Sequence, residues 1–192
     1  MNSLSEKIKT GNATIGVIGI GKRGLPLAAN CANSGFITLG FDSRPIRAEM
    51  INGMNNYIKG YSVKNYRELW YQEVLHGTTD FGSAASRDIV LICADDHIAE
   101  SYFGDITPES CIAAISTYLK RGTAVVYLSN NEKQISQKKM EAIIVEKTKY
   151  RPGDDFICAV GNVDSRGTVV LHDINLISPL MDFFVKTNEE CI

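Results

Sequence analysis

One short stretch near the N-terminus constrains the fold most: an apolar segment, a glycine-rich turn and a second apolar segment that ends in an acid. The turn reads Gly19-Ile-Gly-Lys-Arg-Gly24, and Asp42 follows its last glycine by 18 residues. This is the Gly-x-Gly-x-x-Gly spacing that binds dinucleotides between a strand and a helix. Gly19 allows the tight turn, Gly21 lets a pyrophosphate approach the backbone, and Gly24 lets the helix pack closely on the strand.

The residues around the turn support a ligand site. Apolar residues precede it, leucine and alanine follow it at helical spacing, and Gly35 is a suitable end for the helix. The N–H groups at the start of such a helix bind phosphate. Asp42 can accept hydrogen bonds from the adenosine ribose, which favours NAD over NADP. Arg44 could meet a 2′-phosphate, but the acid repels that group, so NAD or NADH is the expected ligand. A tight turn without a ligand is the alternative.

Composition and charge exclude several other classes. Hydrophobic residues make up 44% and charged residues 22% of the 192 positions, which is ordinary for a globular chain with one core. The net charge of -2 gives no reason to expect nucleic acid as a partner. No apolar run is long enough to span a membrane, and residues 1–13 lack the apolar core of a signal peptide.

The cysteines and histidines indicate a reducing compartment and no metal. The five cysteines are scattered without Cys-x-x-Cys spacing, and most lie in apolar contexts typical of buried free thiols. This usage favours the cytoplasm. The three histidines lie far apart, so we expect no metal site and a structural or surface role for each.

Apolar segments with strand character alternate along the chain with segments of helical periodicity. Such crossovers are right-handed and give a mainly parallel sheet with helices on both faces. We therefore predict a doubly wound α/β fold of the Rossmann type with three layers. Residues 1–13 would form a lead-in helix, residues 14–177 the dinucleotide-binding domain and residues 178–192 a final helix. The expected strands are residues 14–20, 37–42, 78–81, 88–93, 124–129 and 156–160, and the other expected helices are 45–52, 63–75, 107–122 and 134–147.

The run from Gly19 to Leu27 is more specific than a general dinucleotide turn. With its Leu-Pro-Leu ending, it resembles the Gly-x-Gly-Tyr-Val-Gly-Leu-Pro-Leu signature of the nucleotide-sugar 6-dehydrogenases. It looks most like the branch that acts on UDP-N-acetylglucosamine and UDP-N-acetylmannosamine. Further matches are the leading helix, Gly40-Phe-Asp42, Ile51-Asn-Gly53, Tyr57-Ile58, Thr78-Thr-Asp-Phe81, Asp88-Ile-Val-Leu-Ile-Cys93 and Leu119-Lys-Arg-Gly122.

The resemblance implies an NAD-dependent oxidoreductase scaffold of polysaccharide precursor synthesis. Members of this family oxidise the C6 alcohol of a UDP-sugar to a carboxylate by two hydride transfers to NAD, through a cysteine-bound thiohemiacetal. They contain an NAD domain, a central dimerisation helix and a sugar-binding domain. This chain corresponds to the first domain, so the catalytic cysteine with its lysine and asparagine helpers has no counterpart in it. We assign no catalytic residue and interpret Cys191 as a terminal free thiol.

Two loops depart from the family pattern near the expected cofactor. The tyrosine and valine of the glycine turn are Lys22 and Arg23 here, which either strengthen phosphate binding or form a solvated basic turn. The loop after the fourth strand, normally Pro-Thr-Pro beside the nicotinamide, reads Ala94-Asp95-Asp-His97. Its carboxylates and histidine could act as acid or base, but solvated loop side chains are the expected outcome.

Two later loops differ as well. The family's Ser-Thr-x-x-Pro-Gly-Thr-Thr becomes Ser129-Asn130 without the Pro-Gly turn, although the Asn130 amide can still donate a hydrogen bond. The family's Ser-Pro-Glu-Arg becomes Gly161-Asn-Val-Asp164, so the glutamate near nicotinamide and substrate is lost. The cofactor-binding residues expected from the whole sequence are Gly19, Ile20, Gly21, Lys22, Arg23, Gly24, Asp42, Arg44, Ala94, Asp95, Ser129 and Asn130.

Three functions stay open after this comparison. The first is an NAD-binding domain of the nucleotide-sugar dehydrogenase type that cannot complete the oxidation alone: a fragment, a degenerate paralogue or a subunit completed by a second protein chain. A UDP-sugar is a further partner expected for it. The second is a non-enzymatic module, a pseudoenzyme, that senses a dinucleotide or a nucleotide sugar. The third is a different small reductase that reuses the fold.

Overall fold

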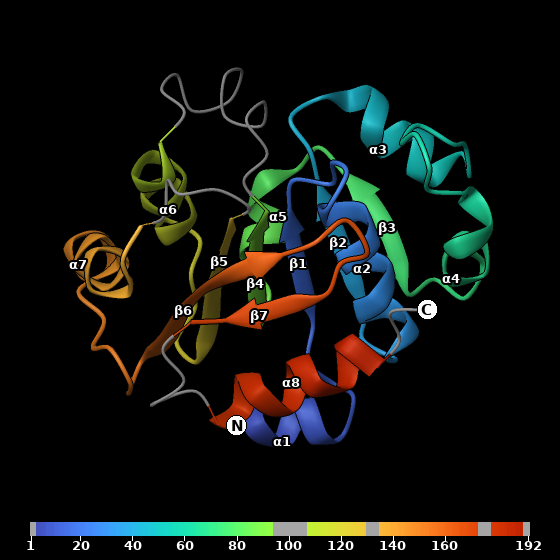
Figure 1. Ribbon diagram of the computed structural model, residues 1–192. Coiled ribbons are helices and arrows are strands. Elements are labelled where there is room, and N and C mark those ends of the chain that lie inside the picture. The colour runs from blue at the N-terminus through green and yellow to red at the C-terminus, as the bar shows by residue number, and fades with distance from the viewer. Residues whose placement is uncertain (1–2, 94–106, 130–134, 173–177, 190–192) are drawn as a thin grey trace.

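The computed structural model describes residues 3–93, 107–129, 135–172 and 178–189, which form a sheet between two layers of helices (Figure 1). The strand order is β3-β2-β1-β4-β5-β6-β7. Neighbouring strands are parallel from β3 to β6, whereas β7 runs antiparallel to β6. The predicted doubly wound, mainly parallel fold with three layers is confirmed. The strands are β1 (Ile15–Ile18), β2 (Thr38–Phe41), β3 (Leu75–Thr78), β4 (Ile89–Cys93), β5 (Thr123–Ser129), β6 (Phe156–Val163) and β7 (Val169–Leu171).

The helices divide between the two faces of the sheet. One core contains side chains from α1, α2, α3, α4 and α8, and the other contains side chains from α5, α6 and α7. The central strand β4 serves both cores, because Ile89 and Leu91 face the first and Val90 and Ile92 face the second. The helices are α1 (Leu4–Lys9), α2 (Gly24–Asn33), α3 (Pro45–Asn52), the 3-10 turn η1 (Val63–Asn65), α4 (Arg67–Tyr71), α5 (Phe81–Ala85), α6 (Pro108–Ser116), α7 (Gln137–Thr148) and α8 (Ser178–Glu189).

Most of the expected strands are confirmed to within three residues at each end. The exception is the segment 78–81, where the prediction of a strand is wrong. β3 ends at Thr78, and Asp80 then caps α5 by accepting the N–H of Ser83 at 3.2 Å. An aspartate two residues before a small-residue run is a helix cap, and that signal outweighs the short apolar pattern here.

The helix expected over residues 63–75 is divided into η1 and α4, and the prediction is wrong after Tyr71. α4 ends at Tyr71, and Glu73 adopts the left-handed conformation with φ of 59°. The chain then enters β3 at Leu75, whose backbone pairs with Thr38 of β2. The helix expected over 107–122 is shorter as well, because α6 ends at Ser116 and Gly122 turns the chain with φ of 85°.

The strand β7 and the helix α8 close one edge of the sheet, and β7 was not expected from the sequence. The Asn188 side chain of α8 pairs with both backbone groups of Val169: its Oδ1 accepts the N–H at 2.9 Å, and its Nδ2 donates to the C=O at 2.9 Å. Phe183 of α8 packs on Phe36 with ring centroids 5.2 Å apart, which joins α8 to the core over α2. The boundary between a domain ending at residue 177 and a separate final helix stays a prediction.

Candidate functional site

The glycine turn is held between β1, β2 and α2. Gly19 has φ of 96°, a conformation that glycine adopts without strain, and its N–H donates to the Phe41 carbonyl of β2 at 2.8 Å. A Cβ added at Gly24 would lie 1.7 Å from the carbonyl oxygen of Gly19, which leaves no room for any side chain. Gly19 and Gly24 are therefore required by the approach of α2 to β1 as well as by any ligand.

The start of α2 has donors but no internal anion. Its cap residue, Arg23, makes no side-chain capping hydrogen bond, and the first turn contains no acid. Pro26 lies in that turn, where a missing N–H costs no helical hydrogen bond. The N–H of Leu25 donates to the Gly21 carbonyl at 3.0 Å, and the positive end of the helix dipole favours an anion at this point. Lys22 is exposed and Arg23 is half-buried beside it.

Asp42 at the tip of β2 is completely buried. Its Oδ1 accepts the backbone N–H of Arg44 at 3.1 Å, and its Oδ2 accepts Nη1 of Arg47 at 2.7 Å. The Asp42 side chain is 1% exposed and the Arg47 side chain 19%. The expected ribose acceptor thus carries a charge-assisted hydrogen bond to a cation on the first turn of α3. Sequence reasoning missed Arg47, although a side chain on the first turn of α3 is well placed to reach back to the strand tip that precedes it.

Tyr57 lies against both parts of the site. Its hydroxyl donates to the Ile20 carbonyl at 2.7 Å, inside the glycine turn. Burial first, and then the neighbouring Tyr66, raise the pKa of Tyr57 well above its usual range; Asp42 raises it further and Arg47 lowers it. The phenol therefore keeps its proton and acts as a donor. It fixes the segment after α3 over the carbonyl side of the turn.

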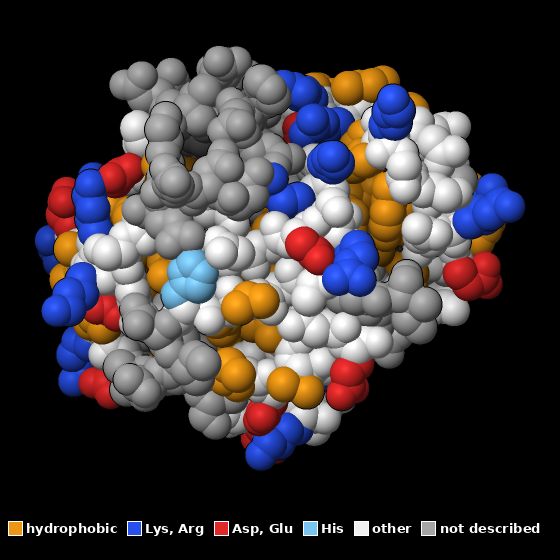
Figure 2. Space-filling view, in the orientation of Figure 1, with side chains coloured by type: hydrophobic (Ala, Val, Ile, Leu, Met, Phe, Trp, Pro, Cys, Tyr) orange, Lys and Arg blue, Asp and Glu red, His pale blue; other side chains and the backbone are white. Residues whose placement is uncertain are grey.

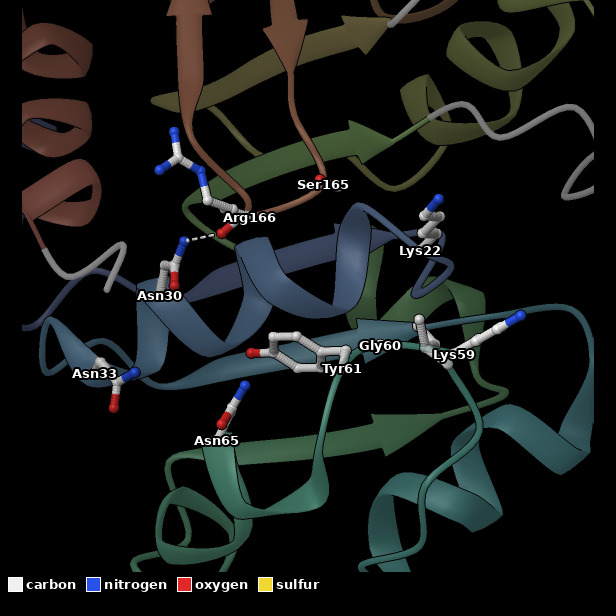
Figure 3. A pocket seen from close by; sticks show the side chains of 10 residues that line it. Lys22, Asn30, Asn33, Lys59, Gly60, Tyr61, Asn65, Ser165 and Arg166 are labelled. Carbon is white, nitrogen blue, oxygen red and sulfur yellow. Dashed lines mark hydrogen bonds between the residues drawn. The ribbon is translucent and has the colours of Figure 1, made fainter.

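A pocket of about 430 Å³ lies along α2, between the segment that carries Tyr61 and the turn that joins β6 to β7 (Figure 3). Figure 2 shows the hollow beside α2, with Lys and Arg side chains around it. The Nδ2 of Asn30 donates to the Arg166 carbonyl at 2.9 Å, and a Cβ at Gly167 would lie 2.5 Å from the Leu27 nitrogen. The β6–β7 turn is thus packed directly on α2. The pocket is lined by Lys22, Asn30, Asn33, Ile58, Lys59, Gly60, Tyr61, Asn65, Ser165 and Arg166.

The opposite half of the expected site is described in part. Ser129 ends β5 and is 5% exposed, at the carboxyl edge of the sheet beside the end of β4. Ala94 and Asp95, with His97, and also Asn130 lie outside the described residues. The structure therefore brings Gly19, Ile20, Gly21, Lys22, Arg23, Gly24, Asp42, Arg44 and Ser129 to the carboxyl edge of the parallel strands.

Val163 stands at the position of the lost family glutamate and is buried at the end of β6, and Asp164 after it builds a turn. Its Oδ1 accepts the N–H groups of Arg166 at 2.8 Å and Thr168 at 2.9 Å. Partial burial raises the pKa of Asp164, but the hydrogen bonds from Thr168 and Arg166 outweigh that effect and lower it. This carboxylate stays ionised and is committed to the link between β6 and β7.

The described cysteines are buried and free. Burial raises the pKa of Cys111 and of Cys158 to about 12, so neither thiol forms a nucleophilic thiolate near neutral pH. Cys191 lies outside the described residues. In the part of the chain that the structure describes, no three potential ligands gather to hold a metal ion, and no helix is long and apolar enough to cross a membrane.

Comparisons with known proteins point to one type of domain. The family model of the NAD-binding domain of 6-phosphogluconate dehydrogenase matches residues 14–150. No curated protein matches the chain at a significant level.

Among solved structures, UDP-D-ManNAc dehydrogenase from Pyrococcus horikoshii is 26% identical, covering 78% of this chain and 36% of that one, with a TM-score of 0.64. NDP-N-acetyl-D-galactosaminuronic acid dehydrogenase from Methanosarcina mazei is 20% identical, covering 97% and 45%, with a TM-score of 0.71. GDP-mannose dehydrogenase from Pseudomonas aeruginosa is 16% identical, covering 90% and 44%, with a TM-score of 0.70. At 20% and 16% identity these two likenesses show the fold alone. The chain spans less than half the length of each of these three proteins.

Proposed function

The chain belongs to the family of NAD-binding domains described for 6-phosphogluconate dehydrogenase, and from that membership we propose that it is the cofactor domain of a nucleotide-sugar dehydrogenase. It binds NAD or NADH and does not complete the oxidation alone. The nucleotide-sugar part of the proposal is supported by the likeness to UDP-D-ManNAc dehydrogenase and by the Leu-Pro-Leu that follows the glycine turn. Residues 14–177 form the binding domain, and residues 1–13 and 178–192 flank it.

The observation that carries the proposal is the start of α2. Its first turn contains neither a side-chain cap nor an acid, and Gly19 and Gly24 bring the helix close to the strand end. Such a helix end fits a pyrophosphate, whose negative charge is stabilised by the positive end of the helix dipole. We propose that Gly19, Ile20, Gly21, Lys22, Arg23 and Gly24 hold the pyrophosphate.

The adenosine half fits less directly. Asp42 is the acceptor that ribose hydroxyls need, yet its carboxylate is covered by Arg47. NAD therefore reaches Asp42 when the Arg47 side chain moves aside, with Arg44 at the rim of the same site. Proton donors from the ribose then replace the guanidinium on the carboxylate, which keeps the buried charge hydrogen-bonded.

The nicotinamide half is assigned to Ala94, Asp95, Ser129 and Asn130. When bound, the cofactor supplies a hydride acceptor, and the residues of this chain orient it without performing acid–base chemistry. The sugar site and the nucleophile belong to a further part or to a second chain, because the chain spans less than half of the dehydrogenases to which it is similar. A reducing cytoplasm is the compartment that the free buried thiols suggest.

Calorimetric titration with NAD, NADH and UDP-N-acetylglucosamine tests the proposal. We expect NAD and NADH to bind and Gly21→Val to lose at least about 100-fold in affinity, because a side chain there keeps the pyrophosphate from the backbone. Gly60→Ala is the control for a general effect on the fold: its Cβ would meet nothing within 4 Å, and the strain at its φ of 85° should cost about 1 kcal/mol of stability and leave NAD affinity unchanged. Lack of binding by the folded wild-type chain at millimolar NAD would overturn the proposal.

A non-enzymatic sensing module is the second candidate, and one observation favours it. Val163 stands at the position of the family's glutamate, is 3% exposed and pairs with Val169 of β7, so this position supplies no carboxylate. Nicotinamide-dependent turnover of a nucleotide sugar by the purified chain, with or without a second subunit, separates the two functions. Turnover excludes the sensing module, and binding without turnover under both conditions favours it.

A further inference from the structure

We infer that Tyr57 positions the glycine turn for the pyrophosphate by holding the Ile20–Gly21 peptide in one orientation. The inference rests on the proposed function and adds to it a residue that lies outside the glycine fingerprint. The Tyr57 hydroxyl donates to the Ile20 carbonyl at 2.7 Å. Tyr57 acts through the backbone of the turn and not by contact with the ligand, so it is a positioning residue.

The Ile20–Gly21 peptide needs an anchor because one of its residues is glycine. Glycine takes φ of either sign without strain, so a peptide next to it can turn over at little cost. On one side, the Gly21 carbonyl accepts the N–H of Leu25 at 3.0 Å and is held by α2. On the other side, the Ile20 side chain is buried against Gly40, where an added Cβ would lie 2.5 Å from its Cγ2. The Tyr57 hydrogen bond fixes the group between them, the Ile20 carbonyl.

The direction of this carbonyl determines where the Gly21 N–H points. The described peptide bonds are all trans, and the C=O and N–H of a trans peptide point in opposite directions. Residues 53–66 lie on the β2 and β3 side of β1 (Figure 1), and Tyr57 directs the Ile20 carbonyl to that side. The Gly21 N–H is therefore directed toward β4. The strand order reverses between β1 and β4, and dinucleotides bind at such a reversal.

Tyr57 can act as an anchor because its own segment, residues 53–66, is held at other points. The Tyr66 hydroxyl donates to the Asn55 carbonyl at 2.7 Å, and the rings of Tyr61 and Tyr66 stack with their planes 5° apart. Tyr57 and Tyr61 are partly buried and pack against the core that contains α2. The turn therefore has its binding shape before the ligand arrives, and little affinity is lost in ordering it.

Tyr57→Phe tests the inference, because it removes the hydroxyl and keeps the ring. We expect NAD and ADP to bind this variant about five- to tenfold more weakly in calorimetric titration, since the diphosphate no longer meets an oriented N–H. Adenosine has no phosphate, so its affinity should not change.

Tyr66→Phe is the matched control. It removes a hydroxyl that also donates to a backbone carbonyl at 2.7 Å, but within residues 53–66 and not in the turn. Urea denaturation measures the stability of both variants, and Tyr66→Phe should change NAD affinity by less than about twofold. Replacing Tyr57 with p-aminophenylalanine retains a donor at the end of the ring and should restore NAD affinity to within about twofold of the wild type.

Wild-type NAD affinity in Tyr57→Phe, or an equal loss in Tyr66→Phe, would overturn the inference and leave the proposed function standing. If the folded wild-type chain binds neither NAD nor ADP, the proposed function itself fails. If Tyr57→Phe does not fold, amide hydrogen exchange of the wild-type chain decides. Saturating NAD should slow the exchange of the Gly21 N–H by about tenfold or more, and an unchanged rate would contradict the inference.

Discussion

The two halves of the carboxyl edge of the sheet differ in what holds their functional residues. At β1 and β2, the glycine turn is required by packing: Gly24 touches the Gly19 carbonyl, and Gly19 bonds to Phe41. At the end of β6, Val163 stands where the family has a glutamate, and the next residue, Asp164, serves the turn between β6 and β7.

This difference shows that a residue of a sequence motif can be kept for one of two reasons, its packing in the fold or its contact with a ligand. Residues such as Gly24 cannot change without disturbing the helix–strand contact, whether or not a ligand binds. A residue whose role is only toward the ligand can change when the reaction is no longer performed. The glycine turn alone is therefore weaker evidence for binding than the uncapped, acid-free start of α2.

The largest effect is expected where the turn serves packing. Gly24→Ala places a Cβ 1.7 Å from the Gly19 carbonyl, which forces the helix away from the strand. We expect a loss of about 3 kcal/mol or more in the free energy of unfolding, measured by urea denaturation. Gly11→Ala, with φ of 72° and nothing within 4 Å, is the control and should cost about 1 kcal/mol. Equal losses in the two variants would show that the packing argument is wrong.

The next effect concerns the ribose end. Asp42→Ala removes the acceptor of the ribose hydroxyls and releases Arg47, so NAD should weaken by about tenfold more than NADP. Calorimetry with both cofactors measures the ratio of the two losses. An equal loss for both would mean that Asp42 acts only through the shape of the strand tip.

Asp164 should affect stability but not binding. Its folded-state pKa is lowered, so its contribution is present above the unfolded pKa near 4 and is lost as the pH falls through the folded value. Asp164→Asn should therefore cost about 1 kcal/mol near neutral pH and lessen the loss of stability on acidification. NAD affinity should not change. A tenfold weaker NAD affinity in the variant would contradict this expectation and show that Asp164 contributes to cofactor binding.

The smallest effect is expected at the exposed end of the glycine turn. If Lys22 meets the pyrophosphate, Lys22→Gln should weaken NAD by about threefold and reduce the dependence of binding on salt. The control is Lys59→Gln, an equally charged neighbour in the pocket along α2. No change at low salt supports the other interpretation of Lys22, a solvated basic turn.

The sequence predicts the architecture well because burial on both faces produces continuous apolar runs such as β4, bounded by glycine and by helix caps. It fails where a local pattern is ambiguous. The short run at 78–81 contains both the end of a strand and the cap of a helix. The left-handed conformation of Glu73, which follows the end of α4, is not predicted by a glutamate at that position.

The candidate site divides in the same way. The roles of Gly19 and Gly24 could be predicted from the sequence, because the backbone at these positions requires glycine. Asp42 could be predicted from its spacing after the glycine turn. The role of Arg47 could not be predicted, because its contact with Asp42 depends on the first turn of α3, which places the Arg47 side chain against that carboxylate. The strand β7 could not be predicted either. Its three residues have a half-exposed pattern and form a strand only because they pair with β6 and are bonded by Asn188.

The Asn188 carboxamide has a consequence for how the molecule behaves in solution. An open strand edge is a template on which other chains can pair, and β7 lies at such an edge with Val170 63% exposed. Asn188 occupies the outward N–H and C=O of Val169 as a foreign strand would. The last helix therefore blocks the pairing of β7 with a strand from another molecule. Removing this helix should convert a dispersed protein into one that self-associates.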